Sequence, residues 1–194
     1  ARKHNISKIE IRQPPPLTAA GNPDKAGARK GNSRNTSPAA RQPEKVRMLL
    51  ELPDSSDTLM SGFKSKLRSQ VKKPARDGLF ARLEGVELLD DFYAVFAENM
   101  RDLGSPVHCK DWLGRVLLFY GEKAKCCVVY MPDQTPVAAG IILCHNRIVS
   151  IPWASSRHQF NRFNPNMLLY WTFLKFAAEG GYRFFDFGRS TPDE

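Results

Sequence analysis

An aspartate and an arginine stand close together near the end of the sequence, at Asp186 and Arg189. They accompany an aromatic-rich stretch that predicts a strand over residues 183–187. A carboxylate at this place can accept a proton from an attacking amine, and a guanidinium can hold a phosphate or a carboxylate. The two residues can equally form an internal ion pair that braces the turn after the strand. The sequence leaves both interpretations open.

A second group of cations recurs at helical spacing within residues 57–72. Lys64, Arg68 and Lys72 follow one another every four residues, beside an apolar stripe, so they share one edge of a predicted helix. Like charges at this spacing repel one another weakly. The pattern is typical of a solvated helix face, or of a surface for the phosphates of a nucleotide-linked substrate or a tRNA acceptor end. In the second case Arg68 would supply forked contacts.

Two further residues are candidates because of the helices that carry them. Arg101 lies near the end of a helix predicted over residues 90–103, where it either binds substrate or satisfies the last carbonyl groups of the helix. Tyr170 lies in a helix over residues 166–179 that is apolar nearly all round and is therefore expected to be buried. Its side chain is either part of the core or a carrier of a hydroxyl group that reaches an acceptor groove.

The sequence offers no recognisable catalytic nucleophile. Its histidines have no acidic partner at a catalytic spacing, and no Gly-x-Ser-x-Gly turn occurs. Its cysteines lack Cys-x-x-Cys spacing, so we expect reduced thiols, no metal site and a cytoplasmic protein. The histidines are His4, His108, His145 and His158, and the cysteines are Cys109, Cys126, Cys127 and Cys144.

The net charge of +9 is carried by the first part of the chain. Residues 1–52 contribute +7 and residues 53–76 contribute +4, whereas the remainder sums to −2. Residues 13–45 are basic and rich in Pro, Gly, Asn and Ser, which predicts a flexible loop that is either solvated or lies over an anionic substrate. This loop has no aromatic side chain for stacking bases, and we expect no DNA partner. The longest apolar run, residues 137–144, is far shorter than the roughly 20 residues of a membrane span.

Hydrophobic periodicity predicts strands and helices along the chain. Residues 9–12 and 46–52 alternate as two half-buried strands, and we infer that they belong to a sheet whose other strands are missing from the chain. Short connections between three central strands predict that these strands pair antiparallel. From residue 57 the predicted order is helix 57–72, strand 85–89, helices 90–103 and 110–120, strands 125–130, 136–144 and 147–152, helix 166–179 and strand 183–187.

This order defines an α+β fold in which helices flank a mixed sheet, and it matches the GNAT type of acyl-CoA N-acyltransferase fold. Enzymes of that type hold the pyrophosphate of acetyl-CoA on the backbone amides of a glycine-rich turn at a helix N-terminus. The corresponding connection here, residues 154–164, contains no glycine. Its composition argues against acetyl-CoA as the acyl donor.

Four segments carry a family resemblance: residues 63–73, 92–106, 164–171 and 185–191. Together they resemble the FemAB-like proteins, most closely the branch associated with exosortase/PEP-CTERM and exopolysaccharide gene clusters. The better-known members of that family transfer an amino acid from aminoacyl-tRNA to the peptide of a cell-wall precursor. The motifs add Ser190 as a candidate substrate contact, and they support Tyr170 as a catalytic candidate beside Asp186 and Arg189.

The resemblance also implies a division into domains. Fem-type proteins have two GNAT-like lobes, so residues 1–52 are expected to be the C-terminal remnant of a first lobe, and residues 53–194 a second lobe truncated at its C-terminus. A lysine that handles the reacting carbonyl group in the cell-wall enzymes would follow Glu194. We therefore expect a fragment that is incomplete at both ends.

The resemblance and the cationic helix predict an acyltransferase with no tightly bound cofactor. We expect it to form an amide bond on an anionic small-molecule or lipid-linked precursor of the cell envelope or of an exopolysaccharide, with aminoacyl-tRNA or acyl-CoA as donor. Such a transfer can proceed by positioning and polarisation, without a covalent enzyme intermediate. The alternatives are a non-catalytic basic module that binds RNA and an assembly partner of the envelope-export machinery. The sequence carries no signal for the oligomeric state.

Overall fold

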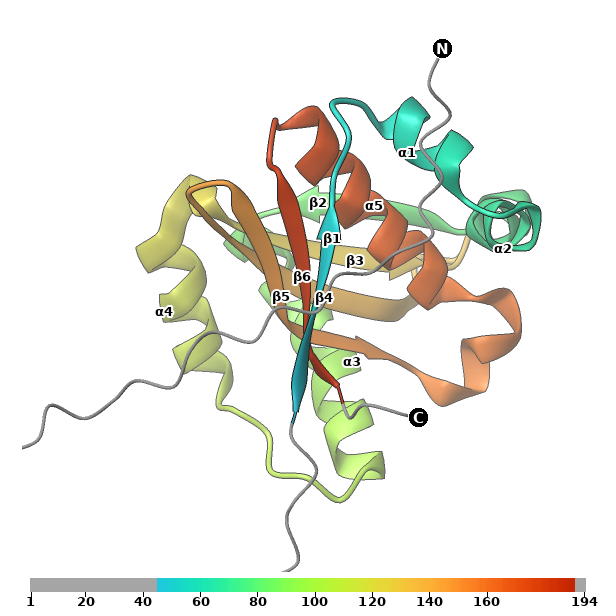
Figure 1. Cartoon of the computed structure of the whole chain (residues 1–194). Coiled ribbons are helices and arrows are strands. Elements are labelled where there is room, and N and C mark those ends of the chain that lie inside the picture. The colour runs from blue at the N-terminus through green and yellow to red at the C-terminus, as the bar shows by residue number, and fades with distance from the viewer. Residues whose placement is uncertain (1–44, 191–194) are drawn as a thin grey trace, which may run out of the picture.

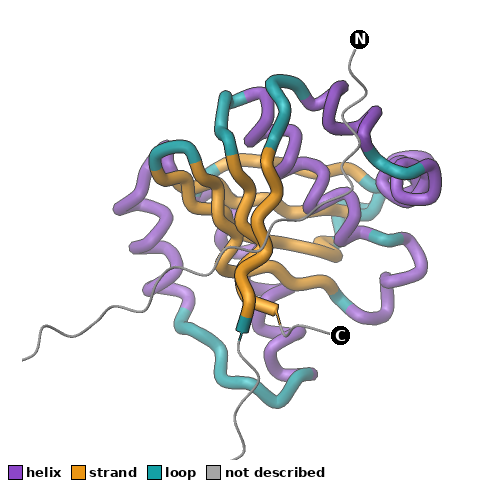
Figure 2. Tube along the Cα trace, in the orientation of Figure 1, coloured by secondary structure: helices purple, strands orange, loops and turns teal. Residues whose placement is uncertain are grey.

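The computed structural model describes residues 45–190, which build a six-stranded sheet with the order β1-β6-β5-β4-β3-β2. In this sheet β5 and β6 run parallel and the other neighbours run antiparallel (Figure 1). Figure 2 shows helices on both sides of the strands. The α+β architecture with a mixed sheet, predicted from the sequence, is confirmed.

The strands are β1 (Val46–Glu51), β2 (Phe80–Glu84), β3 (Ala124–Tyr130), β4 (Pro136–His145), β5 (Ile148–Ser156) and β6 (Phe184–Ser190). The α-helices are α1 (Ser56–Gly62), α2 (Ser65–Arg76), α3 (Leu89–Asp102), α4 (Lys110–Tyr120) and α5 (Pro165–Glu179). Three short 3-10 helices are η1 (Val86–Leu88), η2 (Gly121–Lys123) and η3 (His158–Phe163).

The central strands β3, β4 and β5 form an antiparallel meander, as their short connections predict. The two turns fit these connections because Gln134 and Asn146 take positive φ values of 68° and 50°, which a tight turn requires. Nearly every side chain of β3 is buried, since helices cover both faces of the sheet. The predicted helix over residues 110–120 is also confirmed by α4.

Each face of the sheet has its own hydrophobic core. On one face α1 and α5 pack against the sheet through side chains such as Leu59 and Phe173. On the other face α3 and α4 pack through Phe92 and Leu113. Helix α5 is apolar nearly all round because it lies between the sheet and the pair α1 and α2 (Figure 1).

Strand β1 corrects one sequence-based inference. Its sheet partners are not missing from the chain, because β1 pairs antiparallel with β6 and forms an edge of the same sheet. The inference was wrong because β1 and β6 are far apart in the sequence, and periodicity does not show which strands pair. The predicted strand over residues 9–12 and the basic loop over residues 13–45 lie outside the described residues, apart from Lys45. The division into two lobes stays a prediction.

The predicted helix over residues 57–72 is in fact two helices, α1 and α2. The chain is extended at Phe63 and Lys64, with ψ values of 145° and 149°. The break lets the ring of Phe63 pack edge-on against Trp171, with ring centroids 6.0 Å apart. Helix α2 also continues through Pro74, where the sequence predicts a stop. Pro74 is buried and has no N–H group to donate to the carbonyl oxygen of Gln70, four residues earlier. Gln70 is exposed.

The predicted strand over residues 85–89 is also wrong, because those residues form η1 and the first turn of α3. The strand lies just before it, as β2, and pairs with β3 from Phe80 opposite Tyr130 to Glu84 opposite Cys126. The apolar residues after Gly85 pack on the α3 side of the sheet instead of extending the strand.

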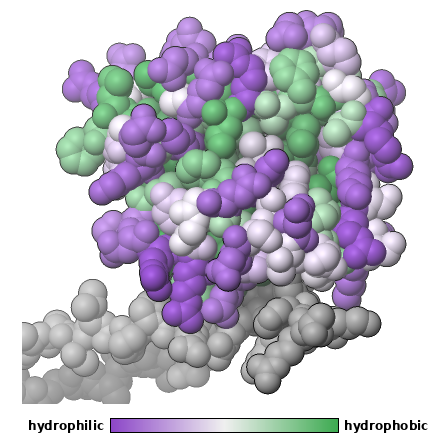
Figure 3. All heavy atoms as spheres, turned by 90° about the horizontal axis from the view of Figure 1, so that it is seen from above, coloured by the Kyte–Doolittle hydropathy of each residue, from purple (hydrophilic) through white to green (hydrophobic). Residues whose placement is uncertain are grey.

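Helix α4 exposes apolar side chains as well as burying them. Leu113 and Leu117 face the sheet, whereas Leu118 and Phe119 are exposed, Phe119 to 87%. Seen from above in Figure 3, apolar surface lies among charged side chains, including at the left edge over α4.

Candidate functional site

The parallel ladder between β5 and β6 is short, and the two strands separate beyond it. β5 continues to Ser156 and β6 to Ser190, so the last part of each strand does not pair with the other. The registered pairs are Ile148 with Phe184, Val149 with Phe185 and Ser150 with Asp186. We call the space between β5 beyond Ser150 and β6 beyond Asp186 the wedge.

Both strands bulge directly after the last registered pair. Residues 151–152 of β5 oppose a single residue of β4, and residues 187–188 of β6 oppose a single residue of β1. A bulge bends its strand, and Pro152 has no N–H group to donate to a neighbouring strand. These local features explain why the ladder ends at Ser150 and Asp186.

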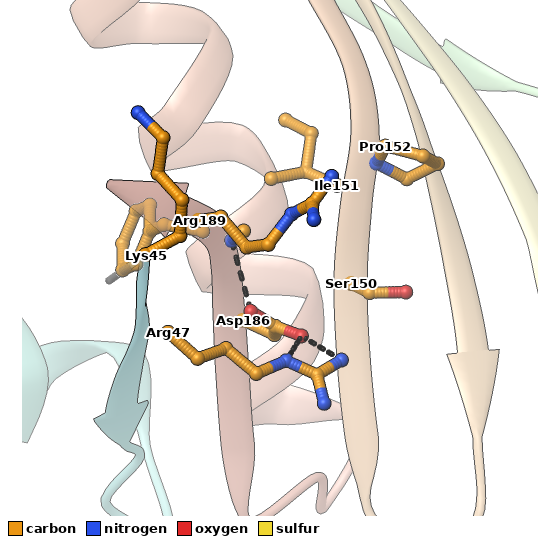
Figure 4. Close-up of a pocket in the computed structure, with 9 residues that line it drawn as sticks. Lys45, Arg47, Ser150, Ile151, Pro152, Asp186 and Arg189 are labelled. Atoms are coloured by element: carbon orange, nitrogen blue, oxygen red, sulfur yellow. Dashed lines mark hydrogen bonds and ion pairs between the residues drawn. The ribbon is translucent and has the colours of Figure 1, made fainter. Parts of the chain in front are cut away.

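An open cavity of about 1010 Å³ lies at the wedge. It is a size that accommodates a small-molecule ligand or part of a larger one. Figure 4 shows its walls coming from the start of β1, the middle of β5 and the end of β6. The described residues that line it are Lys45, Arg47, Ser150, Ile151, Pro152, Asp186, Phe187, Gly188 and Arg189.

Asp186 is buried against this cavity, with 2% of its surface exposed, and its carboxylate is fully engaged. Oδ2 accepts a hydrogen bond from Nε of Arg47 at 2.7 Å and lies 2.5 Å from Nη2 of the same residue. Oδ1 accepts a hydrogen bond from the backbone N–H of Gly188 at 2.9 Å. The arrangement favours the ion-pair interpretation of Asp186, with Arg47 as its partner instead of Arg189. A charge-assisted forked contact of this kind is among the stronger ones in proteins.

Arg189 lies directly opposite Arg47 in the ladder between β1 and β6. Opposite residues of an antiparallel pair project from the same face of the sheet. Figure 4 shows both guanidinium groups reaching toward β5, with Asp186 between them, whereas the side chain of Lys45 points away from these groups. Among the described residues that line the cavity, Asp186 is the one carboxylate, so its lining is positively charged.

A group of aromatic rings lies next to the part of β5 that borders the wedge. Trp153 comes directly after Pro152 and packs edge-on against Trp112 of α4, with ring centroids 5.5 Å apart. His108 lies 4.8 Å from Trp112, centroid to centroid, in a tilted contact. Arg189 and Trp153 each lie three residues beyond the last registered pair, on opposite arms of the wedge. A ligand in the wedge would therefore have cations on one side and aromatic rings near the other.

The connection from β5 to α5 is built without glycine, as the 3-10 helix η3. Asn164 ends η3 with a φ of 55° and precedes Pro165, the first residue of α5. Lys73 of α2 donates a hydrogen bond to the carbonyl oxygen of Arg162 at 3.0 Å, and its Nζ lies 5.7 Å from the centroid of the Phe163 ring. Side-chain contacts therefore hold this connection, and it lacks the residue type that lets a backbone approach a pyrophosphate closely.

Tyr170 and Ser190, two other predicted site residues, lie close to the cavity without lining it. Tyr170 projects from α5 on the opposite face from Asp186 and packs against Phe187, with ring centroids 5.9 Å apart. Burial raises the pKa of its phenol, so the hydroxyl group stays protonated at neutral pH. Ser190 ends β6 opposite Val46. Their catalytic and binding roles stay predictions.

The predicted cations of α2 lie on the α5 side of the molecule and do not line the cavity. Lys64 precedes α2, and Arg68 donates to the carbonyl oxygens of Ser61 at 3.3 Å and Phe63 at 3.2 Å, which ties α2 to the end of α1. Lys72 is exposed.

Arg101 is exposed and pairs with the neighbouring Asp102 at 3.2 Å. The structure therefore brings together Asp186 and Arg189 among the predicted site residues, and it keeps Arg101 and the α2 cations away from them.

Arg47 is one site residue that sequence reasoning missed. The sequence places its strand in another lobe, and its partner Asp186 is 139 residues away in the sequence. A signal was present, because Arg47 is a cation in an alternating strand directly after the basic stretch. Ser150 and Pro152 were missed too, and a proline inside an otherwise strand-like run was the signal for a bulge there.

A mixed sheet that opens between two parallel strands over a cavity, with helices on both faces, is the architecture of GNAT acyltransferases. The sequence family described as "Acetyltransferase (GNAT) domain" matches residues 61–194, and the chain belongs to this family. The GNAT fold predicted from the order of elements is thereby confirmed. No curated protein sequence matches the chain significantly.

Solved structures share the fold at low sequence identity. FemX is 14% identical with a TM-score of 0.66, and the match covers 76% of this chain and 54% of that one. L-PGS from Bacillus licheniformis is 16% identical with a TM-score of 0.55, covering 75% of this chain and 46% of that one. The C-terminal domain of a candidate lysylphosphatidylglycerol synthetase from Agrobacterium fabrum is 14% identical, with a TM-score of 0.57 and the same coverage of 75% and 46%. The chain thus spans about half the length of these structures.

No helix within residues 45–190 is long and apolar enough to cross a membrane. In the same part of the chain, no group of three or more His, Cys, Asp or Glu side chains is placed to hold a metal ion.

Proposed function

We propose that this chain is part of a Fem-type acyltransferase that forms an amide bond at the wedge between β5 and β6. The observation that carries the proposal is the divergence of these strands beyond Ser150 and Asp186, beside a cavity lined with cations. Beyond that pair the two strands no longer bond to each other, so backbone N–H and C=O groups on the facing edges have no partner across the wedge. Such groups can align an extended substrate and polarise its carbonyl group.

The donor that we favour is an aminoacyl-tRNA, with an acyl-CoA as the alternative. The β5–α5 connection supports this preference, because residues 157–164 contain no glycine and form a 3-10 helix held by Lys73. The similarity to FemX, with a TM-score of 0.66, supports it as well, as does the similarity to proteins named for the synthesis of lysylphosphatidylglycerol. A tRNA donor would confine the reaction to the cytoplasm.

The reaction would be a direct transfer. The amine of the acceptor attacks the acyl carbonyl carbon, a C–N bond forms, and the C–O bond of an aminoacyl ester or the C–S bond of a thioester breaks. The proton that the amine loses ends on the departing oxygen or sulfur. The wedge contributes position and polarisation to this step, and the bound carboxylate of Asp186 keeps the cationic wall in place.

The acceptor that we propose is an anionic small-molecule or lipid-linked precursor of the cell envelope or of an exopolysaccharide, as the resemblance to the PEP-CTERM-associated FemAB-like branch suggests. The positive lining of the cavity supports an anionic acceptor. We also keep the proposal that residues 1–52 and 53–194 belong to two GNAT-like lobes. Because β1 pairs with β6, the end of the first segment would then complete the sheet of the second.

The test is a transfer assay with the full-length gene product. Labelled aminoacyl-tRNA and labelled acetyl-CoA are offered separately with envelope precursors, and wild-type protein is compared with Arg189→Ala and with Arg115→Ala. Arg115 is an exposed residue of α4 that does not line the cavity. We expect label in an amide product with the wild type and with Arg115→Ala, and strongly reduced transfer with Arg189→Ala. If neither donor labels any precursor while the protein still binds RNA, the binding-module alternative replaces the proposal.

A further inference from the structure

We infer that Arg47 and Arg189 together bind one singly charged oxyanion of the substrate, either a carboxylate or a phosphodiester. The inference deepens the proposed function, on which it rests for the identity of the ligand as an acyl donor or acceptor. The binding of the anion can be measured without any transfer reaction.

The first argument is the repulsion between the two guanidinium groups. Arg47 and Arg189 are registered partners on β1 and β6, and like charges directly opposite each other destabilise a sheet. A guanidinium group cannot lose its proton in a protein, so both groups stay charged at every physiological pH. Asp186 cancels one of the two charges through its ion pair with Arg47, and a bound anion would cancel the other.

The second argument is the supply of unused donors. Asp186 engages Nε and Nη2 of Arg47, which leaves Nη1 for another acceptor. The guanidinium group of Arg189 has no hydrogen bond or ion pair to any residue within 45–190, and it reaches toward β5 (Figure 4). Two neighbouring guanidinium groups with free donors on the cavity side match the geometry of an oxyanion, which accepts forked hydrogen bonds.

The third argument concerns the charge of the ligand. Arg47, Arg189 and Asp186 together carry one net positive charge, because the carboxylate cancels one guanidinium group, and the side chain of Lys45, the other charged residue of the lining, points away from them (Figure 4). A carboxylate or a phosphodiester balances this charge. A phosphate monoester brings a second negative charge close to the buried carboxylate of Asp186, where water screens repulsion poorly. The site should therefore prefer single over double negative charge.

The roles of the residues differ accordingly. Arg189 contacts the ligand, and Arg47 contacts it with the part of its guanidinium group that Asp186 leaves free. Asp186 is a positioning residue, because it fixes Arg47 and accepts the N–H of Gly188 in the bulge directly before Arg189.

The experiment is an NMR titration of the protein labelled with 15N-arginine, which follows the side-chain Nε–H signals. Acetate, dimethyl phosphate and glycerol 3-phosphate serve as probes for a carboxylate, a phosphodiester and a phosphate monoester. We expect saturable shifts of two arginine signals, with either of the first two probes binding more tightly than glycerol 3-phosphate. Tighter binding of acetate assigns the natural ligand as a carboxylate, and tighter binding of dimethyl phosphate assigns it as a phosphodiester.

Matched variants distinguish residues that contact the anion from residues that have only a structural role. Arg189→Gln should weaken binding of the preferred probe by about tenfold or more, since a forked charged contact is lost, whereas Arg115→Gln should not change it. Arg189→Lys should retain part of the binding. Asp186→Asn raises the net charge of the three groups to two, so it should shift the preference toward glycerol 3-phosphate. A purely structural role of Asp186 would not change which probe binds more tightly.

The inference is overturned if no probe produces saturable shifts, if wild-type protein binds glycerol 3-phosphate most tightly, or if Arg189→Gln and Arg115→Gln behave alike. The transfer assay fails or succeeds independently of this result. Anion binding without transfer would refute the proposed function and support the anion site. Transfer without anion binding would support the proposed function and refute the anion site.

Discussion

Ser150 and Asp186 are the last facing pair of the parallel ladder between β5 and β6, and both residues line the cavity that opens beyond them. The end of the pairing is encoded locally, by a bulge on each strand, one containing Pro152 and the other Gly188. The same bulge on β6 separates Asp186 from Arg189 and brings Arg189 opposite Arg47. The position of the cavity and the position of its charges thus have one structural cause.

Replacement of Gly188 by alanine tests whether the bulge on β6 sets the position of Arg189. Gly188 has a φ of 91°, which a residue with a side chain adopts only at a cost of about 1 to 2 kcal/mol. We expect Gly188→Ala to lose about that much stability in urea unfolding, and to weaken anion binding because the bulge before Arg189 shifts. The chosen control is Gly104→Ala, since Gly104 also has a positive φ, of 63°, and nothing lies near its missing Cβ atom. It should lose comparable stability with unchanged anion binding, and equal loss of binding in both variants would contradict the explanation.

The ion pair between Arg47 and Asp186 should be asymmetric in its contribution to stability. Arg47→Ala leaves the buried carboxylate without its partner and should cost about 3 kcal/mol, whereas Asp186→Asn leaves a guanidinium group that is 53% exposed and should cost about 1 kcal/mol. The double variant should cost less than the sum of the single variants. Urea unfolding of the wild type, the two single variants and the double variant measures these free energies. A larger cost for Asp186→Asn than for Arg47→Ala would show that the pair is not arranged as described.

Much of the fold could be predicted because it depends on local patterns. The apolar runs of β3, β4 and β5, their short connections, and the Asn164–Pro165 start of α5 all depend on neighbouring residues. The break at Phe63 could not be predicted in this way. The break accompanies a contact with Trp171, which lies far along the chain, and the helical stripe itself continues through the break.

The candidate site was predictable only in part for the same reason. Asp186 and Arg189 stand out because they are charged residues at the end of an apolar strand. The partner of Asp186 is on β1, and only the pairing of β1 with β6 places Arg47 there. The cations Lys64, Arg68 and Lys72 form a clear pattern in the sequence, yet periodicity does not show that α2 lies on the α5 side of the sheet.

Thiol chemistry tests the placement of the four cysteines. Cys109 is exposed, whereas Cys126, Cys127 and Cys144 are buried. Burial raises the pKa of the Cys127 thiol to about 12, and it raises the pKa values of Cys126 and Cys144 as well. Because the thiolate is the reactive form, a disulfide reagent at pH 8 should label one thiol quickly and the other three only after unfolding. Rapid labelling of more than one thiol in the native protein would contradict the described packing of the sheet.

Two phenylalanines allow a matched test of the core. Phe173 of α5 is fully buried against the sheet, so Phe173→Ala should cost about 3 to 5 kcal/mol in urea unfolding. Phe119 of α4 is 87% exposed, so Phe119→Ala should change stability by less than about 0.5 kcal/mol. A large loss with Phe119→Ala would mean that the exposed surface of α4 is covered in solution, for example by a second copy of the chain, and sedimentation would then show the association.

The cations of α2 are tested through the salt dependence of tRNA binding. Lys64 and Lys72 are exposed, and the ammonium group of neither makes a hydrogen bond or an ion pair within residues 45–190, whereas the side chain of Arg68 donates to carbonyl oxygens at the end of α1. We therefore change the two lysines to alanine and leave Arg68 intact. If they contact phosphates of the donor, each lost contact should reduce the slope of log K against log salt concentration by about 1, so the double variant should lose about 2.

The matched control for this experiment is the pair Arg115→Ala and Lys123→Ala, which removes two exposed cations on and next to α4, on the other side of the sheet. For this control variant, the slope of log K against log salt concentration should equal that of the wild type. An equal slope for the wild type and the α2 variant would identify the α2 cations as a solvated helix face. In that case any contact with the phosphates of the donor would have to come from outside α2, and the cations at the wedge would be the nearest described candidates.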